Sequence, residues 1–254
     1  MSAPWFGPAR PRPLADVRVV CFPYAGGSAA PFRRWPELLP PWLELWTANL
    51  PGRERRIAEP ALTSIEAIVL AAADALVDSV PAPFALYGHS MGAMIAYELA
   101  HEVVRRGGPE PCGLLVSGAR APHLSEEREP IHHLPDAEFI DALRDLDGTP
   151  TVVFENAELL DLLLPTLRAD FTAVETYRHR IRPTLAGPLV AYAGADDTVV
   201  GVAEVEPWCE HTRGPCRVRT IAGGHFFILD DPASFVARLA ADVRDVVLSG
   251  GPAR

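Results

Sequence analysis

The sequence predicts an α/β fold in which helices cover both faces of a mostly parallel sheet. Two observations support this: short apolar runs of strand length alternate with longer helical patterns, and no repeat or linker divides the 254 residues. Strands that are apolar on both faces are typical of a parallel sheet between two helical layers. With 48% hydrophobic residues, the chain can bury such a core as a single domain over residues 1–254.

The expected strands are short and strongly apolar. They cover Arg18–Phe22, Leu43–Leu50, Phe84–Tyr87, Gly113–Ser117, Leu189–Ala193 and Arg217–Ile221. Three longer amphipathic segments are predicted to be helices: Ile65–Val80, Met91–Arg106 and Pro232–Leu248. The pattern Thr63-Ser64-Ile65-Glu66 predicts a capping box at the start of the first helix.

One long segment interrupts the alternation. Between about residues 123 and 181 no buried strand is recognisable, and the pattern instead predicts helices at Pro135–Leu146, Ala157–Leu164 and Leu167–Arg178. Loops at the carboxyl ends of parallel strands commonly build active sites. We therefore interpret this insertion as a helical lid, with surface decoration as the alternative.

Composition excludes several functions. A net charge of −10 argues against nucleic acid as a partner, because binding phosphates requires a basic face. All 23 basic residues are Arg, so neither a Schiff-base lysine nor a P-loop lysine is available. No apolar run is long enough to span a membrane, and the first residues lack the apolar core of a secretory signal. We expect a cytoplasmic protein without a membrane partner.

The cysteines form no recognisable metal or redox motif. Cys21, Cys112, Cys209 and Cys216 include no C-x-x-C pair and no histidine at metal-ligand spacing. We expect four reduced thiols, with a Cys209–Cys216 disulfide as the alternative, and no metal or cofactor.

A serine lies between two glycines where an expected strand turns into an expected helix. Gly88-His89-Ser90-Met91-Gly92 has the pattern G-x-S-x-G, which also occurs by chance and also fits a helix with a serine N-cap. A strand–turn–helix setting is what a nucleophilic serine requires. So sharp a turn strains the middle residue, and side chains in place of the glycines would collide. We predict that Ser90 is a nucleophile at the positive end of a helix dipole.

Such a serine needs a base, and the base needs a carboxylate. In hydrolases with this elbow the chain order is serine, acid, histidine. His225 follows the last expected strand beside two glycines and is the predicted base. His89 would point away from its neighbour Ser90 and is the weaker candidate, whereas His132 and His133 are expected to be solvated in the insertion.

The acid is expected in the loop after Leu189–Ala193. Both Asp196 and Asp197 lie there, and we choose Asp197, three residues after a glycine, over Asp196. Asp170, in the stretch LRADF of the insertion, is the outside candidate.

An oxyanion hole needs two backbone donors. The N–H of Met91 is one candidate. The other is the N–H of Ala25, with Tyr24 or Gly26 as neighbouring choices, in the Gly-rich loop after the first expected strand. The alternative is that this loop merely turns.

Together these stretches resemble the type II thioesterases. FPYAGGSA, LPGRERR, GHSMGAMIAYELA, LPDAEF, LRADF, GADD and GGHFF occur in this order between about residues 17 and 247. LPGRE and LRADF are the most specific, because general hydrolase chemistry does not require them. The family consists of stand-alone enzymes of modular polyketide synthases and nonribosomal peptide synthetases. One departure is Tyr24, where many relatives have histidine.

The resemblance implies an α/β-hydrolase fold with a helical lid. It also implies hydrolysis of aberrant or stalled acyl groups from the phosphopantetheine of acyl or peptidyl carrier proteins. Ser90 then matches the nucleophile, His225 the base, the aspartate of GADD the acid, and Ala25 and Met91 the oxyanion donors. The carrier protein is the implied partner.

Some alternatives remain open. The arginines of one local cluster either help a carrier to dock or are plain solvated surface: Arg33, Arg34, Arg53, Arg55 and Arg56. The competing functions are a chain-releasing thioesterase domain, a small-molecule serine esterase, and a catalytically silent scaffold on the same fold.

Overall fold

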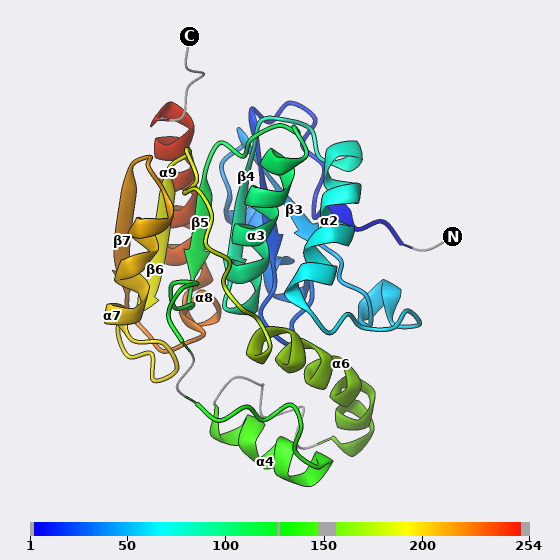
Figure 1. The fold of residues 1–254 in the computed structure, drawn as a ribbon. Coiled ribbons are helices and arrows are strands. Elements are labelled where there is room, and N and C mark those ends of the chain that lie inside the picture. Colours follow the sequence, from blue (N-terminus) through cyan, green and yellow to red (C-terminus); the bar gives the residue numbers. More distant parts are fainter. Residues whose placement is uncertain (1–2, 126–127, 147–155, 250–254) are drawn as a thin grey trace.

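Seven strands form one sheet in the residues that the computed structural model describes, which are 3–125, 128–146 and 156–249 (Figure 1). The strands are β1 (Phe6–Pro8), β2 (Val17–Phe22), β3 (Leu43–Ala48), β4 (Phe84–His89), β5 (Leu114–Ser117), β6 (Leu189–Gly194) and β7 (Cys216–Ile221). Their order is β1-β3-β2-β4-β5-β6-β7. Only β1 runs antiparallel to its neighbour, β3, so the predicted mostly parallel sheet is confirmed.

Helices cover both faces of this sheet. One face carries α2 (Ile65–Ser79) and α3 (Met91–Arg105), and the other carries α1 (Trp35–Leu38), α8 (Phe227–Asp230) and α9 (Pro232–Ser249). Shorter elements complete the layers: α7 (Val202–Val205) and the 3₁₀ turns η1 (Ala30–Phe32), η2 (Glu54–Arg56) and η3 (Glu206–His211). The α/β class is therefore as the sequence predicted.

The two faces bury separate cores because strand side chains alternate. On β2, Val20 and Phe22 pack in the cluster that contains α2 and α3. Val19 and Cys21 pack in the cluster that contains α9. All four side chains are fully buried. A strand apolar on both sides is therefore a central strand, and the Gly-rich loop at its end is held firmly.

The insertion between β5 and β6 contains two helices, α4 (Asp136–Asp145) and α6 (Ala157–Glu175) (Figure 1). They share a small apolar cluster of their own around Phe139, Leu143 and Leu167. The expected break between two helices near residue 165 is wrong, because α6 continues through Pro165. Apolar side chains on both sides of the proline pack in that same cluster, which offsets the lost backbone hydrogen bond.

Some local expectations are corrected. The capping box is wrong: Ser64, not Thr63, is the N-cap of α2, and its hydroxyl accepts from the N–H of Ala67. The sequence also did not predict β1, because only three residues, one of them a proline, pair with the edge of β3.

The prediction of four reduced thiols is wrong for one pair. Cys209 in η3 and Cys216 at the start of β7 form a disulfide, because the chain turns back and brings their Cα atoms to 5.4 Å. Cys21 and Cys112 are free thiols, and burial raises the pKa of Cys112 to about 11. No helix in the described parts of the chain is long and apolar enough to cross a membrane.

Candidate active site

The predicted site residues all follow strands of the parallel part of the sheet. Ala25 comes after β2, Ser90 after β4, Asp197 after β6 and His225 after β7. Since these strands are parallel, their carboxyl ends meet at one edge of the sheet, where α/β proteins bind ligands. β4, which carries Ser90, lies at the centre of the strand order.

Ser90 adopts the strained backbone expected of an elbow. Its φ of 54° and ψ of −117° lie in a region that residues with a side chain rarely occupy. The two glycines make this turn possible. A Cβ on Gly88 would lie 1.9 Å from the carbonyl oxygen of Gly92, and a Cβ on Gly92 would lie 2.2 Å from that of Phe22. The half-buried serine therefore lies at the N-terminus of α3, in a turn that requires glycine at positions 88 and 92.

His225 and Asp197 form a hydrogen-bonded pair. The distance between His225 Nδ1 and Asp197 Oδ2 is 2.8 Å, and both side chains are almost fully buried. The other carboxylate oxygen of Asp197 accepts from the N–H groups of Val199 and Val200, at 2.7 and 2.9 Å. A carboxylate only accepts, so Nδ1 carries the proton and Nε2 remains as the basic atom of the ring.

Asp197 is ionised in this environment. Burial raises its pKa, but the hydrogen bond and charge of His225, together with the two amide donors, outweigh burial and lower the pKa below its ordinary value. Asp196 is different, because its side chain is exposed and only its N–H is held, by the carbonyl of Gly223 at 3.0 Å. The structure thus places Asp197, and not Asp196, beside the histidine.

His89, the residue between Gly88 and Ser90, lies directly beneath the histidine of the pair. Its ring is fully buried, and its centroid lies 5.2 Å from that of His225. Its Nδ1 lies 2.8 Å from the hydroxyl of Ser117, which in turn bonds Tyr87 at 2.7 Å. Burial, followed by the charge of His225, lowers the pKa of His89 well below its ordinary value. His89 is therefore a neutral packing partner of the site.

The loop after β2 makes a tight turn. The N–H of Gly27 donates to the carbonyl of Tyr24 at 2.9 Å, and Gly26 has φ +72°, as the third residue of a type II turn requires. Among the described residues, the N–H groups of Ala25 and Met91 have no hydrogen-bond acceptor. Both remain available to a ligand. Tyr24 is buried and packs edge-on against Phe226, so it closes one side of this loop.

Asp170 is not brought to His225. Its carboxylate instead binds the guanidinium of Arg53 through two contacts of 2.7 Å and accepts from the N–H of Gly26 at 2.7 Å. Asp170 is fully buried, and Arg53 is 6% exposed. The outside candidate for the acid is thus part of a separate buried ion pair.

Comparison with known families agrees with this geometry. Residues 17–243 match the thioesterase domain family, which is most of the chain. The chain belongs to this family. It is therefore a hydrolase that acts on thioesters, and its fold is that of the α/β hydrolases.

Three similar proteins match over most of their length. Thioesterase PikA5 of Streptomyces venezuelae is 42% identical over 90% of this chain and 82% of its own. Linear gramicidin dehydrogenase LgrE of Brevibacillus parabrevis is 38% identical over 92% and 90%. Among solved structures, the type II thioesterase BorB from the borrelidin biosynthetic cluster superposes with a TM-score of 0.87 at 38% identity, covering 96% of this chain and 99% of that one. LgrE is named a dehydrogenase, but the present sequence contains no G-x-G-x-x-G motif of the kind that binds dinucleotides.

Only some of the arginines in the predicted local cluster lie on the surface of the thioesterase. Arg53 is buried against Asp170, and Arg56 is buried against Glu59 and over the ring of Trp5. Both are therefore unavailable to a partner. The remaining three members, Arg33, Arg34 and Arg55, are exposed.

Of the two histidines predicted to be solvated in the insertion, His133 is exposed as expected, but His132 is not simply solvated. His132 Nδ1 lies 2.5 Å from the carboxylate of Glu175, so its ring is held on α6. A second group of histidines lies where the insertion joins the body. His123 and His211 are 2.7 Å apart through ring nitrogens, and the ring of His179 stacks edge-on to His211. The sequence did not reveal this cluster, because His123 and His211, which are in direct contact, are 88 residues apart in the chain.

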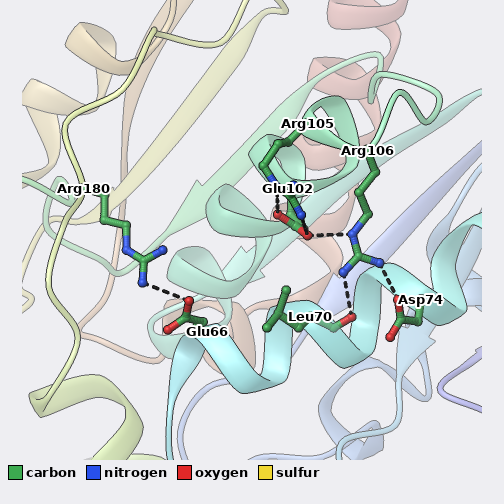
Figure 2. A network of polar contacts seen from close by, with 7 residues as sticks. All are labelled: Glu66, Leu70, Asp74, Glu102, Arg105, Arg106 and Arg180. Carbon is green, nitrogen blue, oxygen red and sulfur yellow. Dashed lines mark hydrogen bonds and ion pairs between the residues drawn. The ribbon is translucent and has the colours of Figure 1, made fainter.

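A polar groove of about 360 Å³ is lined by residues of α2, α3, the end of α6 and the segment that follows α6. Figure 2 shows a network of polar contacts on this side: Arg180, in the segment after α6, binds Glu66 at the start of α2, while Arg106, directly after α3, binds both Glu102 and Asp74. The lining does not include Ser90, Asp197 or His225. This groove therefore lies between helices that ion pairs connect, and none of the predicted catalytic residues lines it.

Proposed function

We propose that this thioesterase hydrolyses acyl groups from the phosphopantetheine arm of acyl or peptidyl carrier proteins by a Ser-His-Asp acyl-enzyme mechanism. The observation that carries the proposal is the buried Asp197–His225 pair at the sheet edge where the strained elbow presents Ser90. A neutral imidazole oriented by a carboxylate is what a serine hydroxyl needs to attack a carbonyl at neutral pH.

In the first step, Oγ of Ser90 forms a bond to the thioester carbonyl carbon while Nε2 of His225 takes the hydroxyl proton. The carbonyl π electrons move to oxygen, and the oxyanion accepts from the N–H groups of Ala25 and Met91. When the oxyanion collapses, the C–S bond breaks and the pantetheine thiolate leaves with its electron pair. The thiolate then takes the proton from His225, which leaves an acyl-serine and a neutral imidazole.

In the second step, water replaces the thiol. His225 takes a proton from water as its oxygen bonds to the acyl carbon, and the same amides hold the new oxyanion. Collapse breaks the bond to Oγ, which regains the proton from His225 and releases the carboxylic acid. Asp197 stays ionised throughout and stabilises the imidazolium in both steps. The mechanism uses only side chains, backbone amides and water, so no cofactor is part of the proposal.

The insertion is proposed to be the lid of this site within a single hydrolase domain. Its helix α6 contacts the loop after β2, where Asp170 binds the N–H of Gly26, so it lies beside one of the two oxyanion donors. A short acyl chain would lie beneath it, while a carrier docked outside extends its arm to Ser90. The exposed arginines Arg33, Arg34 and Arg55 are the proposed contact for an acidic carrier.

The role we propose is editing, that is, the removal of aberrant or stalled acyl units in polyketide or nonribosomal peptide biosynthesis. BorB, a type II thioesterase of a biosynthetic cluster, supports this by its similarity over the full chain. We propose that the protein acts in the cytoplasm.

The experiment that tests the proposal loads one carrier domain with acetyl, propionyl, longer acyl and complete-product groups, and follows release by intact mass. We expect release of the short acyl groups, no release by Ser90→Ala, and slower cleavage of a free ester of the same acid. Faster release of the complete product would show a chain-releasing enzyme, and faster cleavage of the free ester would show a small-molecule esterase. Release by Ser90→Ala at the wild-type rate would contradict the mechanism.

A further inference from the structure

A buried ion pair joins two loops and a helix that are far apart in the sequence. Arg53 follows β3 in the stretch LPGR, Asp170 lies on α6 in the stretch LRADF, and Gly26 and Gly27 follow β2. General hydrolase chemistry does not require the stretches LPGR and LRADF, so their role is still to be explained. We call the Arg53–Asp170 pair, with its contacts to the two glycines, the clamp.

The clamp binds the two peptide units on either side of the Gly26–Gly27 unit, through the N–H of Gly26 and the carbonyl of Gly27. Asp170 Oδ2 accepts from the N–H of Gly26 at 2.7 Å, and Arg53 Nη1 donates to the carbonyl of Gly27 at 2.8 Å. The same Oδ2 also accepts from Nη1 of Arg53 at 2.7 Å, so all these groups form one connected set. Charge-assisted, bidentate contacts of this kind are shorter and more directional than neutral ones.

The turn held by the clamp is the one that carries the N–H of Ala25. Ala25 is the second residue of the Tyr24–Gly27 turn, directly before Gly26. The N–H of Ala25 belongs to the Tyr24–Ala25 peptide unit. Its direction depends on the next unit, Ala25–Gly26, whose N–H is held by Asp170 of the clamp. Helix α6 also packs closely against the turn, because a Cβ on Gly26 would lie only 2.3 Å from the side chain of Leu167 on α6. The turn is thus fixed from α6 by a polar contact and by packing.

The burial of the ion pair indicates that its role is to orient the groups it contacts rather than to add stability. Asp170 is fully buried and Arg53 nearly so, and desolvating both charges offsets much of their attraction. An apolar pair of similar volume would stabilise the fold as well, but it would not orient an N–H and a carbonyl. A second polar contact, from the Thr166 hydroxyl to the carbonyl of Gly52 at 2.6 Å, ties the same helix to the loop that carries Arg53.

We propose that Arg53 and Asp170 are positioning residues that set the rate of acyl transfer by orienting the Ala25 amide toward the oxyanion, and that they make this orientation depend on helix α6 of the insertion. This rests on the proposed function, in which Ala25 is an oxyanion donor. An oxyanion hole accelerates a reaction only when its donors point at the transition state before charge develops. A shift of about 1 Å in such a group lowers the rate by about 100-fold.

The decisive variant is Asp170→Asn, which keeps the shape but places an NH₂ group against an N–H donor of Arg53 or Gly26. Active serine is first titrated to completion with a fluorophosphonate, so that kcat refers to folded sites. We expect kcat on an acyl-pantetheine thioester to fall about 10- to 100-fold and KM to change less than threefold. The affinity for an alkyl boronic acid, whose serine adduct has an oxygen in the oxyanion hole, should fall in parallel with kcat.

Two further variants separate positioning from folding. Asp242→Asn removes another fully buried carboxylate, which on α9 binds Arg219 of β7 and Tyr192 of β6. We expect it to lower the melting temperature while kcat per titrated serine stays within twofold. Arg53→Lys keeps the charge but loses the fork that reaches both Asp170 and Gly27, and it should lower kcat by about tenfold. It decides the question if Asp170→Asn fails to fold.

The outcomes distinguish this inference from the proposed function. If Asp170→Asn, or Arg53→Lys in its place, retains kcat per titrated serine within twofold, the clamp is only structural and the inference is wrong. A fall in kcat without a parallel loss of boronic acid affinity also overturns it. The proposed function fails by a different result, namely full activity of Ser90→Ala.

Discussion

The strand-end loops and the helical insertion hold their important side chains in different ways. The loops that carry Ser90, Asp197 and His225 continue directly from strands whose side chains fill two large apolar clusters. The insertion has only a small apolar cluster, around Phe139, and meets the body through buried polar contacts such as Arg53–Asp170. Local sequence therefore places the candidate site residues, whereas long-range polar pairs hold the insertion against the body.

The largest effects are expected at the strand ends. Replacing Ser90 or His225 by Ala should lower kcat on a carrier thioester by roughly 10⁶-fold, because the two act as one unit. Asp197→Asn should lower it by roughly 10⁴-fold, since Nδ1 of the imidazole then loses its acceptor. Steady-state release of thiol measures these rates. Asp196→Asn is the matched control in the same loop, and a loss there equal to that of Asp197→Asn would reverse our assignment of the acid.

The next effect compares the two apolar cores directly. Phe235 in the sheet core and Phe139 in the insertion are both almost fully buried. Changing Phe235 to Ala should lower the global free energy of unfolding by about 3–5 kcal/mol through lost burial and a cavity. Phe139→Ala should instead raise hydrogen exchange in α4 and α6 while exchange in the sheet stays slow. Equal loss of protection in both regions would show that the insertion and the sheet unfold as one unit.

A medium effect concerns the histidines between the insertion and the body. Burial, and then the positive charge of Arg182, lowers the pKa of His101 to about 4. Burial, followed by the charges of His123 and His179, lowers the pKa of His211 to about 4. The unfolded chain binds these protons near pH 6.5, so the neutral histidines favour folding above that pH.

Stability should therefore fall as the pH decreases from 6.5 toward 4, by on the order of 2 kcal/mol for each histidine after allowance for solvent screening of these partly exposed rings, as measured by urea unfolding. His211→Gln, which retains a polar side chain without the titration, should reduce this dependence. An unchanged slope in that variant would remove His211 from the explanation.

The smallest effect is expected at the rim of the polar groove. Arg180 and Glu66 form an exposed ion pair (Figure 2), and such pairs contribute about 0–1 kcal/mol. Arg180→Ala should therefore change the melting temperature hardly at all. Arg53→Ala leaves Asp170 buried without its partner and should cost about 3–5 kcal/mol. Comparable losses in the two variants, measured by thermal unfolding, would show that burial does not separate these ion pairs.

Much of the fold and of the candidate site was predictable because the signals are local. The strands around Phe22 and Tyr87 are apolar on both faces, and Gly88 and Gly92 permit the close backbone approach that the turn at Ser90 requires. Asp197 and His225 each follow a strand, so a parallel sheet necessarily places them at one edge. Contacts between distant segments left no such signal. Arg53 looked like a surface residue in an arginine-rich stretch, and Asp170 looked like a spare acid, although the two are bound to each other.

The sequence by itself determined the α/β class, the elbow and the order of serine, acid and histidine, because each depends on neighbouring residues or on strand periodicity. Only the tertiary structure decided that Asp197, rather than Asp196, is buried beside His225, that Cys209 meets Cys216, and that Asp170 grips the loop of Ala25. These pairings depend on how loops from different strands and from the insertion approach one another in space. The physical reason is that burial and charge pairing are properties of the packed chain, whereas turns and periodicity are already present in its local sequence.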